Sequence, residues 1–357
     1  MSLIPFRRLS LLLLATAALA PAKVPLAASS AAVLRSGFIF QEAPYPSCHA
    51  SSIVEVSPGR LAAAWFGGTH ERHADVGIWF ALHDGQRWLP ATEVATGVQA
   101  DGSRLPTWNP VLFQPPEGPL HLFYKVGPSP SKWWGMLITS SDGGKTWSEP
   151  RRLPEGILGP IKNKPVVLRD GSWLSPSSTE GTPEGWVVHF EHSQDQGRTW
   201  QIIGPVAKGR GLDAIQPSIL FHANGDLQAL CRTRQGAVGM TWSRDGGKTW
   251  TPIAAAELPN PNSGTDAVTL ADGRQLIVYN HFAHRPDESG KGNRYPLDVA
   301  LSSDGIVWDR VLTLETEPNR AGYAYPAVIQ AQDGSVHITY TWDRQRIKHV
   351  VLDPKKL

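Results

Sequence analysis

The chain has 357 residues, of which 41% are hydrophobic and 18% charged, and its formal net charge is +2 at pH 7. These proportions are those of an ordinary globular protein with a large core. The net charge is close to zero, and basic residues occur only in short pairs such as Arg151–Arg152. We therefore do not expect the protein to bind nucleic acid.

The first segment has the features of an export signal. Arg7 and Arg8 precede an apolar run at 11–20, and small residues suited to cleavage follow near Ala20 or Ala22. This pattern predicts a secretory signal peptide over residues 1–22, too short to span a membrane. We therefore expect a secreted or periplasmic monomer without a membrane span.

A short motif, S-x-D-x-G-x-T-W, recurs at 140–147, 193–200 and 243–250, with shorter D-G-x-x-W forms beginning at Asp84 and Asp304. The aspartates are 58, 53, 50 and 59 residues apart. A nearly constant period in this range predicts a propeller or a similar array. We expect a structural role for these boxes, because Ser and Asp can bond turn amides, Gly supplies positive φ and Trp packs between sheets.

A second repeat lies between the boxes: a polar residue, Pro or Ala, a β-rich run, a glycine turn and another β-rich run. Six copies are spaced 60, 55, 52, 50 and 59 residues apart. Their polar residues are His49, Asn109, Lys164, Gln216, Asp266 and Tyr325.

Each repeat predicts four antiparallel strands, so the expected fold is an all-β, six-bladed β-propeller. A single domain over residues 33–357 holds all six blades. The segment Phe38–Gln41 is expected to add the last strand and close the ring. Cys48 and Cys231 then lie on opposite sides of the ring, which favours two buried thiols over a disulfide.

The six polar residues open the innermost strands and should surround one mouth of the central channel. They either hydrate a tunnel or bind a ligand. The ends of the second strands should add arginines and tryptophans at the same face. Arginine forks grip carboxylates and indole faces stack on sugars, so this face suits an acidic carbohydrate. The expected additional residues are Trp65, Asp75, Trp134, Glu180, Arg232, Arg234, Arg294 and Arg344.

These boxes and residues resemble the sialidase superfamily, specifically secreted bacterial proteins with BNR/Asp-box repeats, over nearly the whole mature chain. The resemblance implies three arginines that bind a sugar carboxylate, a Tyr–Glu pair as nucleophile and base, and an aspartate as acid/base. Tyr325 in YAYPAVIQ looks like the nucleophile, and Asp75 in THERHADVGIW lies near the acid/base position. Arg294 resembles the third arginine, and either Arg232 or Arg234 in ALCRTRQG resembles the second.

The chain departs from this family at two positions. The R-I-P signature of the first blade is replaced by Cys48-His49-Ala50-Ser51, and Gln216 stands where the resemblance implies the glutamate. Glu180 and Asp266 are the alternative bases. His49 is either a space-filling imidazole or a general acid or base.

Three functions remain open at this point. The first is an exo-acting, sialidase-like glycoside hydrolase, with Asn109, Lys164, Asp266, Glu180, Trp65 and Trp134 among its substrate-binding residues. The second is a polysaccharide lyase acting on uronate, and the third a binding propeller without catalysis. No cofactor is implied, and the group of His70, Glu71, His73 and Asp75 is interpreted as a polar rim rather than a metal site.

Overall fold

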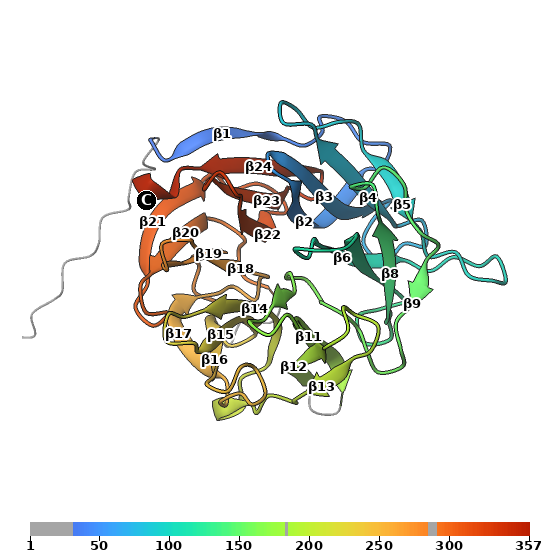
Figure 1. Ribbon diagram of the computed structural model, residues 1–357. Coiled ribbons are helices and arrows are strands. Elements are labelled where there is room, and N and C mark those ends of the chain that lie inside the picture. Colours follow the sequence, from blue (N-terminus) through green and yellow to red (C-terminus); the bar gives the residue numbers. More distant parts are fainter. Residues whose placement is uncertain (1–30, 183–184, 285–290) are drawn as a thin grey trace, which may run out of the picture.

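The structure, a computed structural model, describes residues 31–182, 185–284 and 291–357. Six four-stranded antiparallel sheets surround a ring, so the predicted all-β, six-bladed propeller is confirmed (Figure 1). Two short 3₁₀ turns, η1 (Gly209–Gly211) and η2 (Pro354–Lys356), are the helical elements of the described residues. None of the described helical segments has the length and apolarity to cross a membrane. The expected signal peptide, residues 1–22, lies outside the described residues.

The strands of each blade follow one another from the channel outward. Blade 1 contains β2 (Ser47–Ser57), β3 (Arg60–Gly68), β4 (Gly77–His83) and β5 (Thr92–Ala95). Blade 2 contains β6 (Thr107–Phe113), β7 (Leu120–Val126), β8 (Trp134–Ser140) and β9 (Arg151–Arg152). Blade 3 contains β10 (Val166–Val167), β11 (Trp173–Thr182), β12 (Gly185–Ser193) and β13 (Gln201–Ile203).

The remaining blades follow the same order. Blade 4 contains β14 (Ala214–Phe221), β15 (Leu227–Thr233), β16 (Ala237–Ser243) and β17 (Ala254–Pro259). Blade 5 contains β18 (Asp266–Thr269), β19 (Gln275–Tyr279), β20 (Leu297–Ser302) and β21 (Asp309–Glu315). Blade 6 contains β22 (Tyr323–Gln330), β23 (Val336–Trp342), β24 (Arg346–Leu352) and, outermost, β1 (Val33–Phe38).

The N-terminal strand β1 closes the ring by pairing with β24, with Gly37 opposite His349 (Figure 1). Closure by an N-terminal strand was expected, but the strand ends at Phe38 instead of beginning there. Phe40 leaves the sheet and stacks on Trp65, with ring centroids 5.0 Å apart, whereas Ile39, buried in the same cluster, still donates its amide to the Ile347 carbonyl at 2.9 Å. The apolar side chains of this segment therefore fill the core beside blade 1.

The Asp-boxes are turns that tie neighbouring blades together, as expected. In the third box, Asp245 accepts hydrogen bonds from the amide and hydroxyl of Thr249 at 2.9 and 2.6 Å. Trp250 of that box stacks on Phe190 of the preceding blade at 4.0 Å. The box tryptophans of blades 2 and 3 also contact a phenylalanine of their preceding blade, but edge to face, with ring centroids 5.1 and 6.4 Å apart. The boxes thus act as structural turns.

A β-bulge in the innermost strand aims side chains into the channel. The pairing register shifts in β6, β14 and β22 at Asn109, Gln216 and Tyr325, which have positive φ angles of 37°, 58° and 52°. In blade 1 the shift falls at Ala50, with φ of 57°. The repeat alignment that equated His49 with Tyr325 was therefore wrong by one residue.

Candidate active site

Tyr325 contacts two other residues of the polar ring, Gln216 and His49. Its side chain leaves β22 at the bulge, and the residue is only 9% exposed. The hydroxyl contacts Nη1 of Arg232 at 2.7 Å and Nε2 of Gln216 at 3.2 Å. The predicted neighbourhood of Tyr325 and Gln216 is therefore present, with an amide where a base would stand.

Two arginines flank the Tyr325 ring. Arg232, at the end of β15, donates from Nε to Asn262 and is 4% exposed. Arg294, just before β20, places its guanidinium carbon 5.7 Å from the Tyr325 ring centroid. Burial and the nearby charge of Arg232 lower the pKa of Arg294 to about 10. Two buried guanidiniums this close favour an anion between them.

Of the two arginines that the sequence left as alternatives, Arg232 is the one that contacts Tyr325. Arg234 is half-exposed, stacks on Trp186 at 4.2 Å and lies 4.0 Å from the carboxylate of Asp213. Trp186 also carries Arg232 on its ring at 5.0 Å. One indole therefore supports both guanidiniums, and Arg232 points inward.

A third arginine reaches the cluster from the hairpin of β23 and β24. Nη1 of Arg344 forms an ion pair with Oε2 of Glu71 at 2.8 Å. Burial raises the pKa of Glu71, but the charge and hydrogen bond of Arg344, aided by Lys291 and Arg294, outweigh it and lower this pKa. Glu71 is therefore an ionised carboxylate that faces the arginines.

Asp75 is bonded within its own loop. Its carboxylate accepts from the amide and hydroxyl of Thr69 at 3.0 and 2.5 Å and lies 2.7 Å from His73. Despite an opposing desolvation effect, these bonds lower the pKa of Asp75 to about 2. Glu71, which the sequence reasoning treated only as part of a polar rim, is the acid of this loop that reaches the arginines. Its position between two histidines, in HERH, was the available signal.

Glu180 interacts with Arg232, Arg234 and Trp186. Burial raises its pKa, although Arg232, Arg234 and a hydrogen bond with Trp186 act in the opposite direction. The site therefore contains two carboxyl groups whose environments shift their pKa values apart, Glu71 downward and Glu180 upward. Such a pair is suited to act as base and acid.

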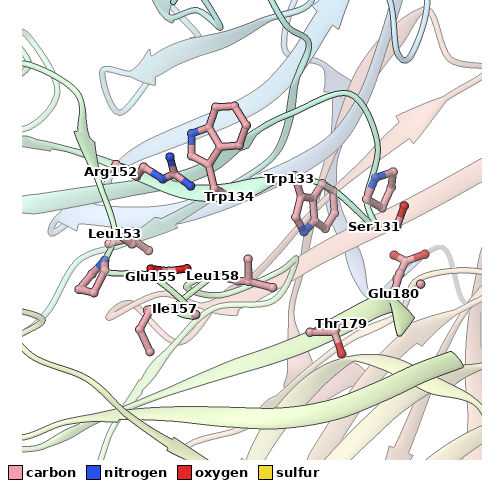
Figure 2. A pocket seen from close by; sticks show the side chains of 14 residues that line it. Ser131, Trp133, Trp134, Arg152, Leu153, Glu155, Ile157, Leu158, Thr179 and Glu180 are labelled. Carbon is pink, nitrogen blue, oxygen red and sulfur yellow. The ribbon is translucent and has the colours of Figure 1, made fainter. Parts of the chain in front are cut away.

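Glu180 also lines a pocket of about 300 Å³ between blades 2 and 3. Figure 2 shows Trp134 and Arg152 on one side of this pocket and Thr179 and Glu180 on another, with Trp133 between them. The guanidinium of Arg152 lies 4.8 Å from the Trp134 ring centroid. Trp134 thus lines this pocket, and Arg152 lies over its indole ring.

His49 is a neutral imidazole packed against Tyr325. Its ring centroid lies 4.2 Å from that of Tyr325, and Nδ1 is bonded to Thr341 Oγ1 at 2.9 Å. Burial, and then the charges of Arg344 and Arg294, hold the pKa of His49 well below its usual range. Nε2 is buried and has no hydrogen-bond partner among the described residues.

Lys164 and Asp266 form an ion pair. Nζ of Lys164 lies 3.1 and 3.0 Å from the two carboxylate oxygens of Asp266. Asp266 also accepts from Ser218 and from the amide of Val328, so its lone pairs are occupied by contacts across three blades. Asp266 is therefore a poor replacement base, contrary to one of the alternatives above.

Two other predicted residues are buried in the fold. Trp65 is 0% exposed, and its Nε1 donates to the Tyr45 hydroxyl at 2.5 Å, so it belongs to the core of blade 1 and not to the site. Asn109 is 6% exposed at the bulge of β6.

Cys48 and Cys231 are free, buried thiols, as predicted. Within the described ranges, no group of three or more His, Cys, Asp or Glu side chains is arranged to hold a metal.

Comparison with known proteins agrees with this architecture. Residues 59–338 match the family described as the BNR repeat-like domain. A sialidase from Bacteroides fragilis is 23% identical over 243 residues, which cover 62% of this chain and 41% of the relative. The chain therefore spans about two fifths of the length of that relative.

Solved structures show the same fold. A protein of unknown function from Dyadobacter fermentans superimposes with a TM-score of 0.73 at 18% identity, covering 90% of this chain and 98% of that one. A Hadza microbial sialidase gives a TM-score of 0.72 at 18% identity, covering 88% of this chain and 67% of that one.

Proposed function

The chain belongs to the BNR repeat-like domain family of sialidase-like propellers, and we propose that it is a glycoside hydrolase that removes a terminal acidic sugar from a glycan. The observation that carries this proposal is the contact of 2.7 Å between the Tyr325 hydroxyl and Arg232, beside Arg294 and Arg344. The sugar is sialic acid or a residue linked to uronate.

The three arginines bind the sugar carboxylate. Arg232 and Arg294 are buried on either side of Tyr325, and Arg344 comes from blade 6. Arg344 supplies the guanidinium that the first blade lacks, because His49 and Ala50 stand in place of the R-I-P signature. Arginine forks bind carboxylates through paired, charge-assisted hydrogen bonds, which fix the sugar's orientation.

Tyr325 is the nucleophile in this proposal. A phenol can approach an anomeric carbon beside a carboxylate, whereas a carboxylate nucleophile would be repelled. The Tyr325 oxygen bonds to the anomeric carbon as the bond to the glycosidic oxygen breaks. Arg232, at 2.7 Å, stabilises the charge on the phenolic oxygen during attack.

The two glutamates move the protons. Glu180, whose pKa is raised, protonates the departing oxygen, and the ionised Glu71 accepts the phenolic proton through water. Water then attacks the anomeric carbon and gives one proton to Glu180 as the bond to the Tyr325 oxygen breaks, and Glu71 returns the phenolic proton to Tyr325. Glu71 thereby takes the role for which the amide of Gln216 is unsuited.

Incubation with sialylated, uronate-bearing and sulfated glycans tests this function. A hydrolase releases the acidic sugar with a mass gain of one water and no new ultraviolet absorbance. Release of an unsaturated, absorbing sugar would instead identify a lyase. Glycan binding without any product would identify a binding propeller and contradict the hydrolase.

A uronate lyase is the second candidate because of one observation, the neutral His49 beside Tyr325. A neutral imidazole can remove the C5 proton of a uronate whose carboxylate is held by arginines. His49→Gln separates the two functions. It removes lyase activity but leaves a tyrosine-based hydrolase active.

We also propose that the protein acts as a secreted or periplasmic monomer. The support for export is the apolar run 11–20 preceded by Arg7 and Arg8. Mass spectrometry of the exported protein tests it by showing whether residues 1–22 have been removed, and size-exclusion chromatography with light scattering gives the oligomeric state.

A further inference from the structure

The innermost strand of blade 3, β10, is short and comprises only Val166–Val167. The segment before it carries Lys162 and Asn163 into the protein interior, where they are 3% and 2% exposed. Neither residue was singled out by the sequence reasoning, which selected Lys164 instead. Two buried polar side chains at the channel need hydrogen-bond partners to offset their desolvation.

Lys162 finds its partners on two other blades. Its Nζ donates to the Pro326 carbonyl at 2.6 Å, the Thr265 carbonyl at 2.9 Å and Oδ1 of Asn163 at 2.8 Å. These three acceptors match the three protons of an ammonium group. Pro326 directly follows Tyr325, so Lys162 holds the backbone immediately next to Tyr325.

Asn163 bonds to the backbone of Gln216, whose side chain contacts the Tyr325 hydroxyl. Its Nδ2 donates to the Gln216 carbonyl at 2.9 Å and the Pro217 carbonyl at 3.2 Å. Gln216 and Tyr325 both have positive φ, at 58° and 52°, a conformation that is costly for residues other than glycine. Such strained residues persist only where the surroundings fix them.

We propose that Lys162, together with Asn163, is a positioning residue that fixes Tyr325 and Gln216 in contact and places a positive charge beneath the Tyr325 ring. Nζ of Lys162 lies 5.7 Å from the centroid of that ring. Gly264 leaves room for the side chains of Lys162 and Gln216, since a Cβ at this position would lie 3.0 Å from Cε of Lys162 and 3.1 Å from Oε1 of Gln216. This inference rests on the proposed role of Tyr325 as nucleophile.

The charged groups around Lys162 make its role pH-dependent. Asp266 of β18 favours the ammonium, whereas Lys164 on the same segment and Arg232 of β15 oppose it; the Tyr325 ring covers it from β22. Burial, only partly offset by Asp266, lowers the pKa of Lys162 to about 7. Above this pH the amine has one donor fewer for its three acceptors.

The test compares Lys162→Met and Asn163→Ala with wild type on an acidic glycoside. Loss of the anchor should lower kcat about 10²-fold, as expected for a reacting group displaced by about 1 Å, with little change in KM because the arginines remain. Lys162→Met should also lose the alkaline decline of kcat near the pKa of Lys162. Asn163→Ala, which keeps the charge, should retain that decline, and it decides the positioning role if Lys162→Met fails to fold.

Lys125→Met is the matched control. Lys125 is a second fully buried lysine whose pKa burial lowers to about 7, and its Nζ bonds to the Pro160 carbonyl. The Lys125→Met variant should leave the alkaline decline of kcat unchanged. An equal change of the pH profile in both lysine variants would overturn the inference.

Crystal structures of the variants separate this inference from the proposed function. If wild type cleaves no acidic glycoside, the proposed function fails. Loss of the 3.2 Å contact between Tyr325 and Gln216 in Lys162→Met and Asn163→Ala would still support positioning, whereas an unchanged contact would overturn it.

Discussion

Arg344 and Glu71 form an ion pair of 2.8 Å that joins the last blade to a loop of the first, although the two residues are 273 positions apart in the chain. The pair brings a third guanidinium to the cluster of Arg232 and Arg294. It also brings an ionised carboxylate to the same place. In the mechanism that we propose, this one contact supplies both the guanidinium that blade 1 lacks at His49 and the carboxylate that blade 4 lacks at Gln216.

Arg344→Met should weaken binding of acidic substrates. A charge-assisted hydrogen bond contributes about 1.5–3 kcal/mol, so KM for an acidic glycoside should rise roughly 10- to 100-fold. Arg346→Met is the matched control, since Arg346 lies in the same hairpin but stacks on Phe38 and Trp342. An unchanged KM in Arg344→Met contradicts a role in carboxylate binding.

Tyr325→Phe should abolish hydrolysis, with a loss of at least about a thousandfold in kcat, because the nucleophilic oxygen is gone. The thermal midpoint should stay close to that of wild type, since the ring and its packing remain. Steady-state kinetics and thermal unfolding measure both quantities. Full activity in this variant rules out Tyr325 as the nucleophile.

Gln216→Glu should increase kcat. A carboxylate 3.2 Å from the Tyr325 hydroxyl can take its proton directly, and a positioned general base contributes about 10²- to 10⁴-fold. Glu71→Gln should slow the wild type but have little effect in the Gln216→Glu background. If Glu71→Gln is equally harmful in both backgrounds, Glu71 is not the base for Tyr325.

Glu180→Gln and Asp75→Asn distinguish the two candidate proton donors. Glu180→Gln should lose most activity on natural glycosides but retain it on aryl glycosides, whose leaving groups need no proton. Asp75→Asn should have a small effect on both, because the pKa of Asp75 is already lowered to about 2. The opposite pattern would restore the assignment that the family resemblance implied.

The ring-closing seam should be sensitive to acid. Trp88 Nε1 donates to Nδ1 of His349, Nε2 of His349 bonds Nδ1 of His337 at 3.0 Å, and Nε2 of His337 bonds Ser335. This chain requires neutral imidazoles. Burial, and then the nearby His337, lower the pKa of His349 to about 3, below its unfolded value of about 6.5.

The unfolded chain therefore binds more protons than the folded one between these two pKa values. The stabilisation is fully present above about pH 6.5 and is lost as the pH falls toward 3. His349→Gln should show a smaller drop in thermal midpoint than wild type between about pH 7.5 and about pH 4.5. The exposed His70→Gln serves as the control, and equal drops in wild type and His349→Gln would refute the role of His349.

Local patterns in the sequence determined the architecture. The period of the Asp-boxes, with glycine turns and alternating β-rich runs, predicts six blades because each blade is built from contacts between neighbouring segments. It also predicts that Tyr325, Gln216 and Asp266 gather at one channel mouth, since the innermost strands all begin at the same face. The closing strand ends at Phe38, and Ile39 and Phe40 beyond it pack into the core beside blade 1.

The tertiary structure alone decided which side chains meet. Contacts between segments that are distant in the chain show that Arg232 rather than Arg234 bonds to Tyr325. Similar contacts bring Glu71 rather than Asp75 to Arg344, and Lys162 rather than Lys164 to the backbone beside Tyr325. Bulges and loops orient these residues, and the orientation depends on packing and charge across the channel. No local repeat in the sequence predicts this orientation. The sequence therefore predicts the ring of blades, whereas the folded structure determines which side chains form the site.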